Sequence, residues 1–293
     1  MKTVTSKSDH FFYILVYVIS IFAFIITLYP FLYILSVSIS DAQAVYAGEV
    51  FLLPKDITFA GYEQVLTEEG LWTAYGNTIF YTVVGTICNI VATCIAAYPL
   101  SRKEMIGRRF FNFMIVFTMY FSGGLIPSYL LITNLGFYNT RWVMIIPGLV
   151  STYNIMVCRS AFASIPNEVM ESAQIDGAND WQIFRSIAVR LITPTIAVLI
   201  LYYAVGHWNN FFTALLYISD QELMPLQVLL RRVLIQASSE LMGGSNASAE
   251  NQSAASLQIR YVTIIVTTLP ILAIYPFLQK YFVKGVMLGA VKG

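Results

Sequence analysis

Six long stretches of the sequence contain no Asp, Glu, Lys or Arg. They are residues 10–40, 70–101, 110–140, 142–158, 191–219 and 261–279. Crossing the hydrocarbon core of a bilayer takes roughly 20 consecutive apolar residues. Five of the stretches reach that length, and the fourth continues past Arg159 through Ser160, Ala161 and Phe162. The sequence therefore predicts an all-α integral membrane protein with six transmembrane helices.

Composition and the first stretch agree with this interpretation. Only 11% of the residues are charged, whereas a soluble domain carries about 25%. The apolar run of residues 11–39 is longer than the roughly 7–15 residues of a secretory signal core, so we expect it to remain as an anchor. The sequence has no basic patch interleaved with aromatic residues, so it gives no indication of a nucleic-acid partner. The three cysteines, Cys88, Cys94 and Cys158, lie in predicted spans at spacings that fit no metal site.

The charges of the connecting loops predict the orientation. Residues 101–109 carry four basic residues and one acidic residue, and the tail after the last span carries Lys280, Lys284 and Lys292. Residues 40–75 carry six acidic residues and one basic residue. Lys and Arg concentrate in cytoplasmic loops. We therefore expect both termini in the cytoplasm, with 101–109 and 159–190 cytoplasmic and 40–75, 132–141 and 219–260 outside.

The loop at residues 159–190 is predicted to form two short helices. Pro166 suits a helix start, and Gly177 suits the position just past a helix end. A second helix follows at once, because Asn179 can cap it and Gln182 stands three residues later in a capping-box relation. The second helix then carries one apolar stripe at helical spacing, made of Trp181, Phe184, Ile187 and Leu191.

The first of these two helices has an acidic edge formed by Glu168, Glu171 and Asp176. Helices that lie on a membrane surface prefer Lys and Arg on their polar face. A protein partner is therefore favoured over an amphipathic connector that lies on lipid.

Residues 171–178, Glu-Ser-Ala-Gln-Ile-Asp-Gly-Ala, resemble the EAA motif of type I ABC importer permeases. The continuation at 181–187 with Pro194 matches the carbohydrate branch of that family, although Ser172 replaces an Ala and Arg190 stands where relatives usually have Pro. Residues 121–127 with 139–142 are similar to permeases for complex oligosaccharides, and residues 279–293 resemble the tail of MalG-like subunits.

This resemblance implies the type I ABC importer permease fold and a set of partners. The loop would dock on a cytoplasmic ATP-binding subunit dimer that carries ATP and Mg, so that this chain binds no cofactor and is not itself an enzyme. A second, MalF-like permease would complete a heterodimer, and an extracytoplasmic solute-binding protein would deliver the substrate. The residues implied in ATPase coupling are Glu168, Glu171, Ala173, Asp176, Gly177, Trp181 and Phe184.

The same resemblance divides the chain and sets its location. Residues 1–40 form the N-terminal tail and first span, and 41–75 an extracytoplasmic loop. The permease core covers 76–282, with coupling helices at 164–190 and an outer loop at 219–260, and a cytoplasmic tail covers 283–293. We expect a multi-pass protein of a prokaryotic plasma membrane. The small, polar residues 243–256 are predicted to be a flexible loop that touches the binding protein.

Polar groups within the spans indicate a path for a neutral solute. No charged side chain lies inside a predicted span, where an unpaired charge is costly. Gly123–Gly124 before Pro127 is expected to break the third span, either beside a cavity or as a kink facing lipid. The candidate path residues are Tyr120, Ser122, Gly123, Gly124, Tyr153, His207, Trp208, Asn209, Asn210 and Phe211.

Alternatives remain for several of these residues. Asn209 and Asn210 suit hydrogen bonds to a sugar and contacts between helices equally well. His207 stands alone as a proton relay, so a packed structural histidine is favoured. The cargo is expected to be a largely neutral oligosaccharide unless Arg141, Arg231 or Arg232 supplies a counter-charge.

The predicted function is import of a sugar or oligosaccharide. A polyamine, amino acid or phosphate is the alternative cargo. A membrane enzyme is disfavoured because the chain has two histidines and neither an HExxH nor a GxSxG motif. An ion-coupled carrier is disfavoured because it leaves the acidic double-helix loop unexplained.

Overall fold

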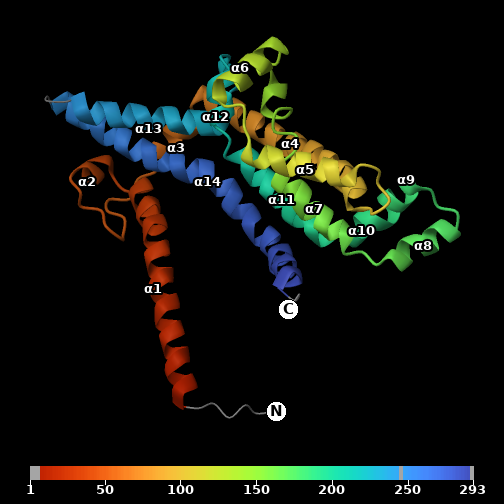
Figure 1. Cartoon of the computed structure of the whole chain (residues 1–293). Coiled ribbons are helices and arrows are strands. Elements are labelled where there is room, and N and C mark those ends of the chain that lie inside the picture. The colour runs from red at the N-terminus through yellow and green to blue at the C-terminus, as the bar shows by residue number, and fades with distance from the viewer. Residues whose placement is uncertain (1–6, 244–246, 291–293) are drawn as a thin grey trace. The chain divides into compact units, whose positions relative to one another are not determined.

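The computed structural model describes residues 7–243 and 247–290, with side chains for residues 10–236 and 252–273, and every regular element in these ranges is helical (Figure 1). The all-α prediction is therefore confirmed for the described chain. The described residues form two compact units, whose bounds along the chain are as follows. The first comprises 1–68 and 230–269, and the second comprises 69–229 and 270–293.

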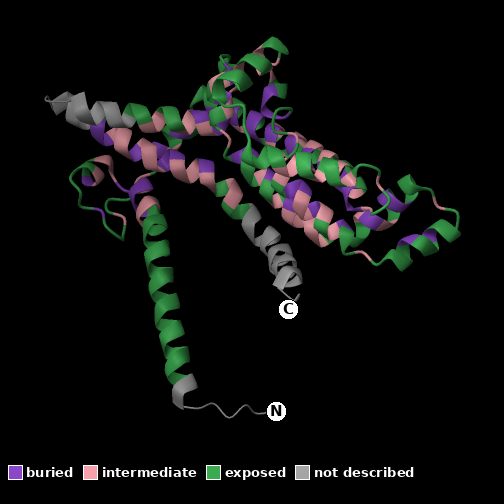
Figure 2. Ribbon diagram, viewed as in Figure 1, coloured by how far each residue is buried: buried purple, intermediate pink, exposed green. Residues whose placement is uncertain are grey.

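The first unit contains α1 (Lys7–Ser38), α2 (Ala42–Tyr46) and α3 (Ala60–Leu66), together with parts of α13 (Leu226–Gly243) and α14 (Ala247–Ala290). From His10 to Leu32 every residue of α1 is exposed, as Figure 2 shows. Only its last turns are covered, where Val37 packs with Ala44 and Val50 against Tyr33 and Tyr261. In the following connection the Glu49 carboxylate accepts a hydrogen bond from Lys55, which raises the pKa of that ammonium group.

Helix α14 corrects one prediction. It begins at Ala247, so residues 247–256 are helical rather than a flexible loop, and residues 244–246 lie outside the described residues. Ala, Glu and Gln in this segment are good helix formers. The helix also buries a stripe at four-residue spacing, made of Ala254, Gln258 and Val262, and the Gln258 amide donates to the Ser40 carbonyl at 2.7 Å. Small polar composition was therefore a poor sign of disorder here.

The second unit is built around α4 (Glu69–Ser101). This helix lies beside α7 (Thr152–Ala163) and α11 (Thr193–Trp208) (Figure 1). The buried core between them contains Cys94, Ala97, Leu100, Ile155, Cys158, Phe162 and Leu199. The Sγ atoms of Cys94 and Cys158 lie 4.0 Å apart and both thiols are free, so these two cysteines serve as small buried packing residues.

The remaining elements of this unit are short. They are α5 (Arg108–Tyr120), α6 (Leu125–Asn134), the 3₁₀ turn η1 (Arg141–Met144), α8 (Asn167–Ile175), α9 (Asp180–Ile183), the π-helical turn η2 (Phe184–Ala188), α10 (Val189–Leu191), α12 (Phe212–Tyr217) and the 3₁₀ turn η3 (Gln221–Leu223).

Among the described residues, three helices are long and apolar enough to cross a membrane, at 10–38, 69–101 and 252–273. Two bent helix pairs, α5 with α6 at 114° and residues 180–191 with α11 at 80°, raise the number to as many as five. In the predicted fourth span, residues 145–151 are irregular and α7 has 12 residues, about 18 Å of helix. Six spans and cytoplasmic termini therefore stay predictions.

The break predicted in the third stretch is present. Helix α5 ends at Tyr120 and α6 begins at Leu125. Gly124 between them has a φ of +88°, a backbone conformation that a residue with a Cβ adopts only at a cost. The glycine pair therefore allows the sharp 114° bend between the two helices.

Candidate functional site

Residues 164–190, called the 164–190 loop from here on, fold as two helices joined by a glycine turn. Helix α8 follows Pro166, and Gly177 has a φ of +83° just after the helix ends. Helix α9 follows Asn179. The Asn179 side chain accepts from the Gln182 backbone N–H at 2.9 Å, and the Gln182 side chain accepts from the Asn179 N–H at 2.9 Å. The predicted glycine turn and capping box are both confirmed.

Burial divides the residues that the sequence assigned to this loop. Ala173 and Phe184 are buried, whereas Glu168, Glu171, Asp176, Gly177 and Trp181 are exposed. The acidic edge of α8 therefore faces away from the core of the unit. On the inner side, Met170 of α8 and Ile183 of α9 are almost fully buried. They pack in the same core as α4 and α7 and so hold the loop against these helices. Neither residue belongs to the motif at residues 171–178 that marks this loop in the sequence.

The predicted apolar stripe of the second helix is divided between buried and exposed residues. Phe184 and Ile187 pack into the core, but Trp181 is 60% exposed and Leu191 is 51% exposed. Leu191 follows the π-helical turn at residues 184–188, whereas Trp181 precedes it. A π-turn inserts an extra residue into the helix and rotates everything after it to another face.

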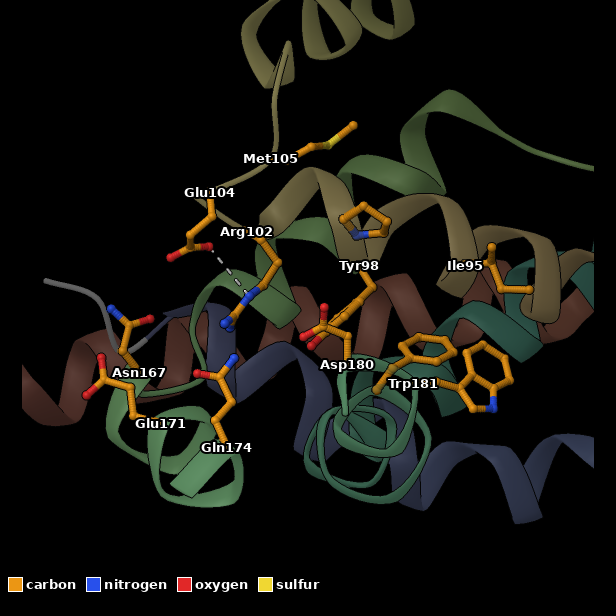
Figure 3. A pocket seen from close by; sticks show the side chains of 12 residues that line it. Ile95, Tyr98, Arg102, Glu104, Met105, Asn167, Glu171, Gln174, Asp180 and Trp181 are labelled. Atoms are coloured by element: carbon orange, nitrogen blue, oxygen red, sulfur yellow. Dashed lines mark ion pairs between the residues drawn. The ribbon is translucent and has the colours of Figure 1, made fainter. Parts of the chain in front are cut away.

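A groove of about 800 Å³ opens between the loop and the end of α4. Figure 3 shows Arg102 between two groups of side chains, with Asp180 and Trp181 on one side and Glu171 and Gln174 on the other. Arg102 lies 3.8 Å from Glu104 and 6.0 Å from the centre of the Tyr98 ring. The lining carries three carboxylates, from Glu104, Glu171 and Asp180, against the one guanidinium of Arg102. The groove therefore has an acidic character with an aromatic floor, which suits a basic or mixed protein surface.

The base of the groove is rigid. The Tyr98 ring lies 5.3 Å from that of Phe162 and 5.1 Å from that of Phe184, so that aromatic contacts join α4, α7 and η2. The Nε atoms of Arg108 and Arg159 both donate to the Leu100 carbonyl at 3.1 Å. Positive charge at the carboxyl end of α4 is favourable because it opposes the helix dipole. The basic residues at 101–109, which predicted orientation, thus also include structural members of this site.

The candidate path residues fall into separate parts of the second unit. Tyr120 and residues 122–124 lie at the exposed break between α5 and α6, and Tyr153 lies at the start of α7. His207 and Trp208 form the buried last turn of α11. The break between α11 and α12 contains the remaining candidates, Asn209, Asn210 and Phe211.

The polar residues near that break have defined partners. The Asn209 amide donates to the Val205 carbonyl at 3.0 Å, and Asn210 Oδ1 accepts from the Thr213 N–H at 3.2 Å. Both bonds are local, so these two amides finish one helix and start the next. His207 Nε2 lies 2.6 Å from Asn89 Oδ1 in α4, which is the packed arrangement that sequence analysis favoured.

Comparison with known proteins adds to this geometry. Residues 70–288 match the family described as binding-protein-dependent transport system inner membrane component. The chain is 40% identical to Protein LplC of Bacillus subtilis, over 92% of this chain and 90% of that protein. It is 35% identical to the polygalacturonan/rhamnogalacturonan transport system permease protein YtcP of the same organism, over 97% and 99%.

A solved structure is similar as well. It is the crystal structure of a bacterial ABC transporter involved in the import of the acidic polysaccharide alginate. One of its chains superposes with a TM-score of 0.86 at 36% identity, over 94% of this chain and 98% of that one. These matches agree with the permease resemblance that the residues around Gly177 carry.

Proposed function

Because the chain belongs to the family of binding-protein-dependent transport system inner membrane components, we propose that it is a permease subunit of an ATP-driven importer for a sugar or oligosaccharide. The family match covers residues 70–288, and two similar proteins are transport components for polysaccharides by name. Members of this family are transport subunits and not catalysts. The substrate is delivered by an extracytoplasmic binding protein and enters the cytoplasm of a prokaryote.

The observation that carries the proposal most directly is the 164–190 loop. Its acidic edge is exposed, its inner side is anchored by Met170 and Ile183, and it borders an acidic groove at the end of α4. A rigid exposed loop of this kind is suited to docking on a cytoplasmic ATP-binding subunit dimer, which holds ATP and Mg. The second partner is a MalF-like permease that supplies the other half of the pathway, and residues near 243–256 are the proposed contact with the binding protein.

The cargo class includes acidic oligosaccharides. The similar solved transporter imports the acidic polysaccharide alginate, which favours the alternative in which a basic residue supplies a counter-charge to the sugar. Arg141 is one candidate. It is the only charged residue between Arg109 and Arg159, it is exposed, and its guanidinium lies 5.4 Å from the centre of the Phe80 ring. Competition between neutral and acidic oligosaccharides for uptake decides the charge of the cargo.

Replacing Gly177 tests the role of the 164–190 loop. No atom lies within 4 Å of a Cβ built at this position, so the effect of a side chain comes from the positive φ alone. That strain costs on the order of 1 kcal/mol, which is too little to prevent membrane insertion. It changes the angle between α8 and α9. We expect Gly177→Val to assemble with the second permease but to lose nearly all ATP-dependent uptake.

Gly177→Asn is the matched control, because Asn tolerates the left-handed conformation, and it should transport at close to the wild-type rate. Glu171→Ala should have a mild effect, since an exposed charge contributes little to affinity. The measurements are uptake in proteoliposomes and co-purification of the ATPase. Full transport by Gly177→Val would remove the coupling role of the loop.

A further inference from the structure

One buried amide in α4 holds two other parts of the second unit. Asn89 is fully buried, and its Nδ2 donates to the carbonyls of Gly148 and Leu149, both at 2.7 Å. Its Oδ1 lies 2.6 Å from Nε2 of His207 in α11. Both amide hydrogens of Asn89 are used, so its oxygen accepts and the His207 proton lies on Nε2. We call this arrangement the Asn89 joint.

A second pair of side chains supports the same segment from one turn away. The hydroxyls of Thr93 in α4 and Tyr203 in α11 lie 2.7 Å apart, and the Tyr203 oxygen accepts from the Ser151 N–H at 3.3 Å. The irregular residues 145–151 thus find partners on both long helices. Non-helical backbone inside a membrane protein is stable only where such partners satisfy its polar groups.

The position of the joint connects it to the 164–190 loop. Helix α7 ends at Ala163, just before that loop, and α11 begins at Thr193, just after it. Their opposite ends, at Thr152 and Trp208, are the ends that the joint fixes to α4. The two helices have 12 and 16 residues, or about 18 and 24 Å of length. Helices α7 and α11, called the two struts below, therefore both run from the loop to the Asn89 joint, next to the break at residues 209–211.

We propose that Asn89 and His207 are positioning residues for transport, because they hold the far ends of α7 and α11 together. A displacement of the 164–190 loop then moves the irregular segment 145–151 and the break at 209–211 as one body. Without the joint, α7 and α11 move independently of each other. ATP hydrolysis on the partner subunit then no longer moves the residues of the substrate path. The inference rests on the proposed function, since it concerns how the same loop acts on the substrate path.

The chain offers a matched control on the same helix. Asn77 is also a buried amide of α4, and its Nδ2 donates to two loop carbonyls, those of Glu222 at 2.6 Å and Met224 at 3.2 Å. The chemistry is the same, but its partners lie in the connection between α12 and α13 and not at the ends of the struts. Loss of Asn77 should therefore cost stability without changing the coupling of ATP hydrolysis to transport.

The experiment compares Asn89→Leu with Asn77→Leu in the complete transporter, reconstituted with its ATPase, second permease and binding protein. The measured quantity is oligosaccharide imported per ATP hydrolysed. Leaving buried carbonyls unpaired is expected to lower this ratio roughly tenfold in Asn89→Leu. Asn77→Leu should lower the yield of complex and leave the ratio within about twofold of wild type. An unchanged ratio in Asn89→Leu, or an equal fall in both variants, would overturn the proposal.

A second pair of variants keeps the test decisive if Asn89→Leu does not assemble. His207→Gln retains an N–H that can donate to Asn89 Oδ1, whereas His207→Leu does not. We expect the Gln variant to keep most of the wild-type ratio and the Leu variant to lose it, and equal ratios would overturn the proposal. Failure of the proposed function itself has a different signature, in which the wild-type complex imports no oligosaccharide.

Discussion

Helices α1 and α4 are nearly equal in length and very different in environment. They have 32 and 33 residues, and both contain apolar windows, with mean hydropathy of 2.6 and 1.9. None of the α1 window is buried inside the described structure, whereas 33% of the α4 window is. The more buried helix is thus the less apolar one, which is the reverse of the pattern in soluble proteins.

The polar residues of α4 explain this reversal. One face of α4 carries a polar side chain at every fourth position, except that Gly85 takes the middle position. The polar side chains are those of Asn77, Tyr81, Asn89 and Thr93, and each forms a hydrogen bond with a neighbouring segment. In the exposed part of α1 the Thr27 hydroxyl bonds to carbonyls of its own helix, at Ala23 and Phe24. The described side chains of α1 bond to another segment only at its covered end, where Ser36 bonds to Leu52 and Ser38 to Tyr62. Apolar packing gives little preference for protein over lipid, so close backbone approach and hydrogen bonds select the helix that becomes the scaffold. A polar stripe within a long apolar run therefore marks a contact with protein.

The largest difference in stability is expected between variants that enlarge one side chain on each helix. A Cβ at Gly85 would lie 2.5 Å from Nε2 of His207. Gly85→Leu must displace this ring and is expected to destabilise the second unit by about 3 kcal/mol or more. Ala23→Leu on exposed α1 is expected to change stability by less than about 0.5 kcal/mol. Thermal unfolding of the purified complex in detergent measures both, and similar losses would contradict the scaffold role of α4.

A smaller difference in stability is expected between variants that remove one tyrosine hydroxyl from each helix. The buried Tyr81 donates to the Leu223 carbonyl at 2.8 Å. Tyr81→Phe is expected to cost about 1 kcal/mol, because the carbonyl loses its partner. Tyr17 of α1 is 67% exposed, and Tyr17→Phe should be neutral. The same unfolding assay serves, and a neutral Tyr81→Phe would show that the polar stripe contributes little.

The smallest effect is expected on α4 itself, away from its packed side. No atom lies within 4 Å of a Cβ built at Gly76, which belongs to the same helix as Gly85. Gly76→Ala is expected to be neutral or to stabilise by about 0.5–1 kcal/mol, because Ala is the better helix former. A clear loss of stability at Gly76 would mean that this side of α4 is also covered, for example by the second permease.

The sequence by itself determined the local features of this protein. The helical class follows from the long uncharged runs, and the bend at Gly123–Gly124 and the turn at Gly177 follow from the conformational freedom of glycine. The start of α9 follows from the Asn179 and Gln182 cap. These features depend on residues a few positions apart, whose interactions are the same in any fold. The family resemblance around Gly177 rests on the same local pattern.

Only the tertiary structure decided which polar residues of the spans meet. Asn89 bonds to Gly148, 59 residues away, and to His207, 118 residues away. The division between the exposed Trp181 and the buried Phe184, and the helix that replaces the expected loop at 247–256, depend likewise on packing against distant segments. Buried amide hydrogens and carbonyls must be paired, but many pairings satisfy this rule along a single sequence. The packing of α4, α7 and α11 brings one set of these groups within hydrogen-bonding distance and so selects it.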